Sequence, residues 1–213
     1  MASALLALGA GLFDQGRTTL AHDAVDDAID IYRALEMPKG LVRALVTRSN
    51  IRRTMGDLRN SGLDLDQAHK LLEGLGSLPS EAAAIAGARA GLEELRGDTK
   101  AARIHLKRAH NQYLAANMPA GAHHAALIEL QLNALSSPDR DIVQALQDER
   151  LMAANGFYET TGDTNGQWLV LQTRARLKRC HRDLQGAADL FDQLAAKASS
   201  RGHVLDAVMG KIE

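Results

Sequence analysis

Proline and glycine recur along this chain at an interval of 40 or 41 residues, and this interval limits the possible folds more than any other feature. Prolines follow a large apolar residue at Met37-Pro38, Leu78-Pro79 and Met118-Pro119. Glycines keep the same period at Gly16, Gly56 and Gly97. Proline is tolerated in the first turn of a helix, and glycine is favoured just after a helix ends. The interval therefore predicts repeated pairs of helices, each joined by a glycine turn.

The second helix of each predicted pair carries a constant apolar position. Ser137 and Arg182 stand near the next two places where the turn glycine is expected. Nine residues after the five turn residues the chain has Val25, Leu65, Leu106, Leu146 and Phe191. Twelve residues after them it has Ala28, Ala68, Ala109, Glu149 and Leu194, and five residues after them it has Ala21, Ser61, Ala102, Ile142 and Ala187. Large apolar residues flanked by small ones allow two helices to approach closely.

These positions predict five helix pairs. We expect first helices over 3–15, 39–55, 80–96, 120–135 and 166–181, and second helices over 18–35, 61–74, 99–117, 139–155 and 183–199. The fourth pair is irregular, because residues 156–163 lengthen its spacing to the fifth. Insertions in helical repeats map to loops on one face, often a binding face. A longer connecting turn without a role is the interpretation we favour for this stretch.

The last residues, 204–213, begin a sixth first helix that has no second helix after it. Two interpretations compete, a short capping helix and the cut end of a longer protein. We favour the longer protein, because this helix carries Leu205, Val208, Met209 and Ile212. An apolar stripe at the end of a repeat array needs a following element to cover it.

Composition narrows the classes of protein further. Aromatic residues make up 3% of the chain, which disfavours an aromatic-rich β-sandwich. A formal net charge of -1 provides no global attraction to nucleic acid or to an anionic membrane surface. The single cysteine, Cys180, excludes an intrachain disulfide framework. No apolar run approaches the roughly 20 residues of a membrane span, and we expect a cytoplasmic protein.

Catalytic and metal-binding patterns are weak. No glycine-rich loop of the phosphate-binding kind is present, and Gly9 and Gly11 fit helix packing better. His105 and His110 are five residues apart and His123 and His124 are adjacent, so neither pair has metal-ligand spacing on a helix. We therefore expect no metal, no cofactor and no catalytic residue. The rival hypothesis is an enzyme centred on Cys180, whose basic neighbours could activate the thiol, or on a histidine-rich groove. A structural thiol is the favoured interpretation.

The first repeat resembles the tetratricopeptide repeat (TPR) family. The residues that carry the resemblance are Leu5, Leu8, Gly9, Leu12, Gly16, Ala21, Val25 and Ala28. The usual unit of that family has 34 residues. The period of 40 or 41 is more similar to a long-unit subclass found in regulatory and sensor proteins. The resemblance implies an all-α, right-handed α-solenoid of about five TPR-like helical hairpins plus a terminal helix. It implies a single domain over 1–213, with units at about 1–37, 38–78, 79–118, 119–163 and 164–202, and a last segment over 203–213.

In this family the first helices line a concave groove that holds a peptide partner. The resemblance places these side chains in the groove: Arg43, Asn50, Arg53, Glu94, His124, Gln131, Gln172, Arg176 and Arg179. Four arginines against one glutamate favour an acidic peptide or a C-terminal carboxylate. Arg48 and Arg52 stand where apolar residues are expected, so the register of the first helices in the second and third repeats has two solutions that differ by one residue.

The resemblance further implies a non-catalytic protein-interaction scaffold. It would form the regulatory or sensory arm of a larger signalling or transcription-regulating protein, whose output domain is a nucleotide cyclase, a diguanylate cyclase or a DNA-binding domain. A homodimer formed through the end helices, with Val208 and Ile212 in the interface, is the alternative. Nucleic acid is less favoured than peptide, because the basic stretches lack interleaved aromatic residues for base stacking. Only Trp168 lies nearby, and we expect it to pack against Leu171 or Phe157.

Overall fold

The computed structural model describes the backbone of residues 1–136 and 145–200, and the side chains of residues 1–135 and 145–196. In these ranges the chain forms α-helices and no strand. The chain divides into two compact units, the first over Met1–Asn117 and the second beginning at Met118. The expected all-α fold built from helical hairpins is confirmed.

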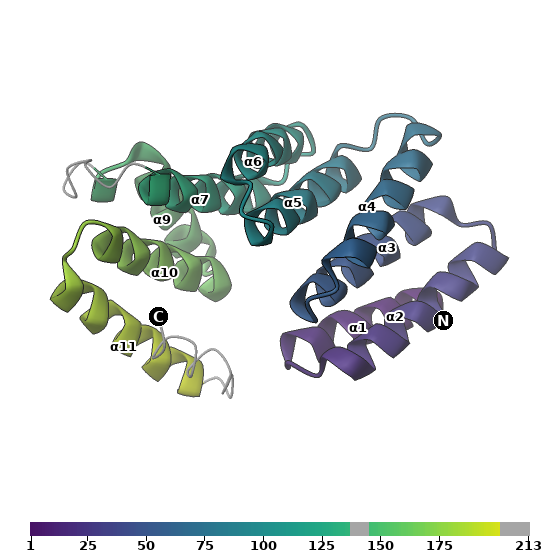
Figure 1. The fold of residues 1–213 in the computed structure, drawn as a ribbon, viewed down its shortest axis with the longest axis horizontal. Coiled ribbons are helices and arrows are strands. Elements are labelled where there is room, and N and C mark those ends of the chain that lie inside the picture. Colours follow the sequence, from purple (N-terminus) through teal and green to yellow (C-terminus); the bar gives the residue numbers. More distant parts are fainter. Residues whose placement is uncertain (137–144, 201–213) are drawn as a thin grey trace. The chain divides into compact units, whose positions relative to one another are not determined.

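The first unit consists of three antiparallel hairpins. Their helices are α1 (Ala2–Asp14), α2 (Thr18–Ala34), α3 (Pro38–Thr54), α4 (Leu58–Glu73), α5 (Pro79–Leu95) and α6 (Thr99–Ala115). Figure 1 shows α1 with α2, α3 with α4 and α5 with α6 lying side by side, joined by short turns. Pro38 and Pro79 are the first residues of α3 and α5, as the sequence predicted.

The turn glycines are confirmed as the residues that end each first helix. Gly16, Gly56 and Gly97 have φ angles of 74°, 83° and 81°, in the left-handed region where glycine has no steric penalty. In the second and third hairpins the aspartate after the glycine caps the second helix, whereas Arg17 of the first hairpin makes no such hydrogen bond. Asp57 accepts a hydrogen bond from the backbone N–H of Asn60, and Asp98 accepts one from Ala101. Glycine followed by aspartate thus ends one helix and starts the next.

The two helices of a hairpin occupy different sides of the first unit. The first helices are neighbours, since α3 contacts both α1 and α5. The second helices α2, α4 and α6 pack against the first helices. We call the surface of α1, α3 and α5 the first-helix side and the surface of α2, α4 and α6 the second-helix side. Between them lies an aliphatic core that includes Val25, Leu45 and Leu65, each 0% exposed. Gly9 is buried where a side chain would strike Val25, whereas Gly11 faces open space, so helix packing explains only the first.

Arg48 and Arg52, which stand at positions expected to be apolar, form a buried ion-pair network. Asp64 on α4 has a side chain only 4% exposed, and it accepts hydrogen bonds from both arginines. Arg48 Nη2 lies 2.6 Å from Asp64 Oδ1, and Arg48 Nη1 lies 2.7 Å from Asp26 Oδ1 on α2. The network joins α2, α3 and α4. The arginines therefore point to the second-helix side, and the apolar first-helix positions are the neighbouring Leu45 and Ile51.

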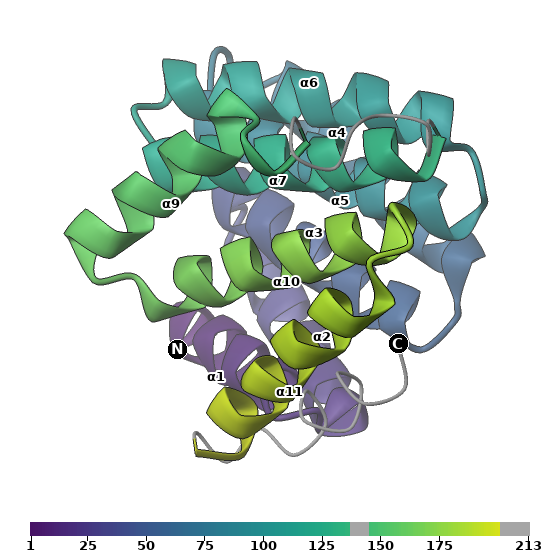
Figure 2. The same ribbon diagram turned by 90° about the vertical axis from the view of Figure 1, so that its left-hand side faces the viewer.

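The second unit contains α7 (Pro119–Ser136), α9 (Glu149–Thr161), α10 (Thr164–Cys180) and α11 (Leu184–Ser200). Helix α10 contacts α7, α9 and α11, and Figure 2 shows α9 leading to the start of α10 and α11 lying beside it. Leu127, Leu151 and Leu177 form the centre of one apolar cluster. Trp168 and Leu171, one of its two expected partners, both pack against a second cluster that contains Phe191. Cys180 is free and half-buried against the first cluster.

The prediction for the second helix of the fourth repeat was wrong. We expected a helix over 139–155 and a connection over 156–163, but α9 runs over Glu149–Thr161. Gly162, with φ of 68°, ends it, and Asp163 caps α10. The buried positions of α9 are Leu151 and Ala154, both 0% exposed, whereas the expected Leu146 is half-buried against the same cluster and the expected Glu149 is exposed. Ser137, residues 139–144 and the expected sixth helix with Val208 and Ile212 lie outside the described residues.

Candidate peptide-binding surface

The predicted groove residues divide between the two units. Four belong to the first unit, namely Arg43, Asn50, Arg53 and Glu94. Five belong to the second, namely His124, Gln131, Gln172, Arg176 and Arg179. The two sets have different surroundings within their own units.

A cavity of about 310 Å³ opens on the first-helix side of the first unit. First helices of all three hairpins line it, together with one tyrosine from α2. The lining residues are Ser3, Leu6, Ala7, Ala10, Tyr32, Arg43, Val46, Thr47 and Ala84. Small side chains on α1 and α5 leave the space, and Leu6 and Val46 make it apolar. A volume near 300 Å³ is at the lower end of the range for ligand sites.

Arg43 is the charged residue of this cavity. Its side chain is exposed, and within the described part of the chain no carboxylate lies at ion-pairing distance from it. The hydroxyl of Thr47 donates to the backbone carbonyl of Arg43, 3.1 Å away, so its proton is already used in a hydrogen bond within α3. An exposed guanidinium beside an apolar hollow can hold a carboxylate with two parallel hydrogen bonds while an apolar side chain fills the hollow.

Arg53 and Glu94 form the far end of the predicted surface in the first unit. Arg53 lies across Gly91 of α5, where a Cβ atom would come 3.2 Å from its Cζ atom. Burial lowers the pKa of the Arg53 guanidinium, and the charge of Glu94 opposes this shift. Arg53 is thus held between α3 and α5, with a carboxylate near it. Asn50 is half-buried one turn before it.

In the second unit, the predicted residues form a polar contact between α7 and α10. Gln131 is only 5% exposed, and its Nε2 donates to Thr173 Oγ1 over 2.7 Å. Arg176 Nη1 donates to Gln131 Oε1, also over 2.7 Å. Gln131 therefore positions Arg176. The guanidinium of Arg179 lies 5.9 Å from the ring centre of Phe191, within reach of a cation–π interaction. His124 is exposed, and Gln172 is half-buried.

Several residues of the cavity were missed by the sequence analysis. Ala7, Ala10 and Ala84 carry no functional group, so nothing in their chemistry marks them. Tyr32 does have a sequence signal, because it precedes Gly40 by eight residues and its ring occupies the space where a Gly40 side chain would lie. Tyr158 and Gly166 repeat this spacing and this contact in the second unit.

In the described residues, no group of three or more His, Cys, Asp and Glu side chains is placed to hold a metal ion. None of the helices in the described ranges combines the length and the apolar character required to cross a membrane.

The chain matches no protein family model and no curated protein. Among solved structures it is similar to one described as the crystal structure of a Rap protein complexed with competence and sporulation factor. The TM-score is 0.61 and the sequence identity is 17%. The fold is that of a helical-repeat protein. The match covers 99% of this chain, whereas this chain spans 61% of the length of the Rap protein.

Proposed function

We propose that this chain is a non-catalytic scaffold that binds a peptide on its first-helix side. The observation that carries the proposal is the cavity lined by α1, α3 and α5, with the exposed Arg43 at its edge. The similar Rap protein was solved with a bound factor, which supports a binding role for this fold. The preferred partner is a peptide with a carboxylate next to an apolar side chain, because the carboxylate matches Arg43 and the side chain matches the hollow.

In the longer protein that we infer, the chain serves as a regulatory or sensory arm, and the peptide controls an output domain outside these residues. This follows the resemblance to long-unit TPR proteins. A role in the cytoplasm and in signalling or transcription is part of the same proposal. Homodimer formation through the last helix is the alternative.

The test is a binding screen of the intact chain against an array of acidic peptides with free C-termini, at low and at physiological salt. We would compare Arg43→Glu, which reverses the charge, with Ala7→Phe, which fills the cavity from an exposed position. Arg59→Glu is the control, because it makes the same charge change at an exposed position on the second-helix side.

The expected result is salt-sensitive binding that both cavity variants lose and the control keeps. Surface electrostatic attraction weakens as salt screens it, so binding should fall at the higher salt. Equal binding by all four proteins would place the peptide elsewhere. Failure of every peptide to bind would contradict the proposal and favour self-association, which sedimentation of the same samples would show.

A further inference from the structure

A second cavity, of about 450 Å³, lies on the second-helix side of the first unit and has no part in the proposed peptide site. Helices α4 and α6 form its walls and α5 forms its floor. The two cavities use different faces of α5, because Ala84 lines the first, whereas Ile85, Ala86 and Arg89 line the second. A successive pair of residues on a helix points about 100° apart.

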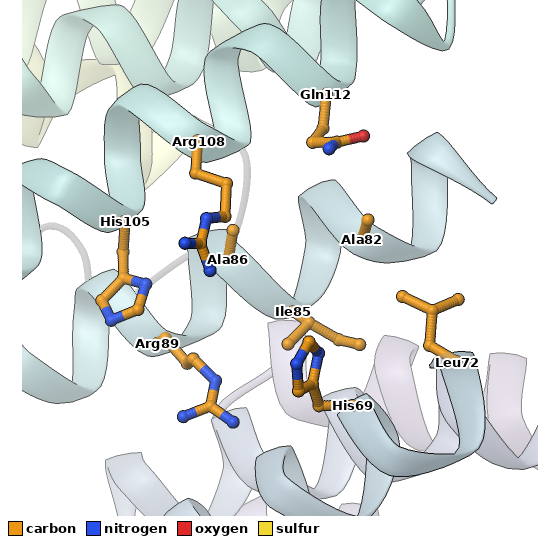
Figure 3. A pocket seen from close by; sticks show the side chains of 9 residues that line it. All are labelled: His69, Leu72, Ala82, Ile85, Ala86, Arg89, His105, Arg108 and Gln112. Atoms are coloured by element: carbon orange, nitrogen blue, oxygen red, sulfur yellow. The ribbon is translucent and has the colours of Figure 1, made fainter. Parts of the chain in front are cut away.

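The side chains of this cavity are sorted by polarity. Figure 3 shows Arg108, His105 and Arg89 gathered at one end, while Ile85 and Leu72 lie toward the other. Gln112 and His69 complete the rim. His69 is 3.5 Å from Glu73, and so already has a partner. The cavity therefore has a cationic end and a mainly apolar end, which Gln112 and His69 border.

His105 has an unpaired nitrogen atom, and this atom suggests a ligand. Its Nδ1 atom is buried and has no hydrogen-bond partner within the described residues. Buried polar atoms in folded proteins are nearly always paired, so an unpaired one needs an explanation. Burial lowers the pKa of His105, and the charges of Arg89 and Arg108 lower it further, so the ring is neutral at pH 7. A neutral imidazole still has one N–H to donate.

The two arginines differ in their availability. Arg89 reaches α4, where its Nη2 donates to Asp66 Oδ1 over 2.8 Å, so part of its charge is already compensated. Arg108 is exposed, and no carboxylate within the described residues lies at ion-pairing distance. In the tautomer that carries the proton on Nδ1, His105 would donate this N–H to an anion that also accepts from the guanidinium of Arg108.

We propose that this cavity binds a small amphipathic carboxylate, with its carboxyl group between Arg108 and His105 and its apolar part over Ile85 and Leu72. The shared chemistry is a carboxylate attached to a short aliphatic group. It has two sources, a free short-chain carboxylic acid and the C-terminal residue of a peptide. A planar carboxylate suits the paired N–H groups of a guanidinium. A bare anion would leave the apolar end of the cavity empty.

The experiment is calorimetric titration of the intact chain with hexanoate at pH 7. Hexan-1-ol tests the apolar part alone, and acetate and inorganic phosphate test the anion alone. Arg108→Gln removes the free cation at an exposed position, so the fold should be unaffected, which circular dichroism checks. Lys100→Gln removes an equal charge from an exposed position of α6 that does not line the cavity.

The expected result is saturable binding of hexanoate that Arg108→Gln weakens by roughly tenfold or more and Lys100→Gln leaves unchanged. Loss of one charge-assisted contact has an effect of this size. In the unaltered chain, hexanoate should also shift the imidazole NMR signals of His105, which His105→Gln identifies by their disappearance. Absence of hexanoate binding, equal binding of hexan-1-ol, acetate or phosphate, or indifference to Arg108→Gln would each overturn the proposal.

A further arm separates the two sources. An acetylated tripeptide ending in leucine is titrated as the free acid and as the C-terminal amide. Binding of the free acid alone assigns the cavity to peptide C-termini as well as to free acids, and binding of neither peptide restricts it to free acids. Equal binding of acid and amide would show that the carboxylate is not recognised and would overturn the proposal.

Discussion

One residue in each hairpin turn that the structure describes adopts the left-handed conformation. This residue is glycine in the first three hairpins and Arg182 in the last. Arg182 stands where Gly16, Gly56 and Gly97 stand in other hairpins, and it keeps the left-handed conformation with φ of 64°. Its backbone N–H donates to the carbonyl of Arg179, and that of Asp183 donates to Lys178, as in the glycine turns. The left-handed conformation costs an L-residue roughly 1–2 kcal/mol. The packing of the hairpin therefore holds Arg182 in a strained conformation.

We predict that Arg182→Gly raises the free energy of unfolding by a few tenths to about 1 kcal/mol. The gain from removing strain is larger than the entropy that glycine adds to the unfolded chain. Urea denaturation followed by circular dichroism measures the change. Gly97→Arg is the matched control and should lower the stability. A loss of stability in Arg182→Gly would mean that the arginine side chain makes a contact worth more than the strain.

Tyr158 predicts a pH dependence of stability in the alkaline range. It is 2% exposed, and its hydroxyl donates to the carbonyl oxygen of Ala120 over 2.9 Å. Burial raises its pKa to about 12, with a smaller contribution from Asp163. Above pH 10, the unfolded tyrosine releases its proton while the folded one keeps it. The folded state then binds more protons, so stability falls as pH rises from about 10 to about 12.

The check is urea denaturation of the unaltered chain and of Tyr158→Phe at pH 8 and pH 11. The variant should be less stable at pH 8, because it lacks the hydrogen bond, by about 1 kcal/mol. Its further loss on going to pH 11 should be smaller than that of the unaltered chain by roughly 1.4 kcal/mol. An identical loss in both proteins would show that the pKa of Tyr158 is the same in the folded and unfolded chains.

Between elements, a tyrosine at the end of one hairpin fixes the start of the next. The ring of Tyr32 on α2 lies against Gly40 on α3, and the ring of Tyr158 on α9 lies against Gly166 on α10. In both places a Cβ atom on the glycine would overlap the ring. The glycine therefore serves close packing between repeats and has an ordinary helical conformation. The same spacing of eight residues occurs in the sequence at Tyr113 and Gly121.

Substitution of these helical glycines should have opposite effects according to their surroundings. Gly40→Ala should destabilise the chain by about 1–3 kcal/mol, because the added methyl group forces the Tyr32 ring or the backbone to move. Gly87→Ala should stabilise it by up to about 1 kcal/mol, because a Cβ atom there meets nothing within 4 Å and alanine favours a helix. Thermal unfolding of the two variants measures the contrast. Equal effects would contradict the packing role of Gly40.

On the scale of the whole molecule, the ion-pair network of Asp64 determines how strongly neighbouring hairpins support one another. It joins α2 of the first hairpin to α3 and α4 of the second. The stability of a repeat protein is the sum of the stabilities of its units and of the contacts between neighbouring units, and this network belongs to the contacts. The network also replaces the apolar contacts that the repeat pattern predicts at Arg48 and Arg52.

We predict that Asp64→Asn lowers the free energy of unfolding by about 3–5 kcal/mol, because it leaves two arginines without their buried partner. Asp66→Asn, two residues along α4, breaks the more exposed pair with Arg89 and should cost less than about 1 kcal/mol. Urea denaturation compares the two. A small, similar effect at both sites would show that water compensates Arg48 and Arg52 after the substitution.

The sequence predicted the fold well because its signals were local. Proline at the first helical position and glycine in the left-handed turn act through the backbone. Their spacing, together with the apolar and small positions counted from each turn, located nine of the ten described helices to within a few residues. The fourth repeat failed because its counting began at Ser137, whereas Tyr158 and Gly166 mark the phase that α9 follows. The partner of Arg48 was not predictable, since Asp64 stands sixteen residues away and only the packed hairpin brings the two together.

The candidate sites could be predicted only in part. The resemblance to the repeat family placed Arg43 on the first-helix side. The cavity beside Arg43 could not be predicted and is known only from the structure. The cavities themselves result from small or apolar side chains such as Ala7, Ala84 and Ile85, whose types occur throughout the chain. Absence of a side chain leaves no chemical signal in a sequence. Only the three-dimensional arrangement shows which alanines face a space and which face a neighbour.

Helix α5 is shared by both cavities, and this has a thermodynamic consequence. Ala84 lines one cavity, and Ile85, Ala86 and Arg89 line the other. A ligand in either cavity therefore contacts the same helix. If one occupant changes the affinity for the other by some factor, the second must change the affinity for the first by an identical factor. The binding of a small acid would then change the affinity for the peptide, and the binding of the peptide would change the affinity for the acid. The occupancy of each site would depend on the concentrations of both ligands.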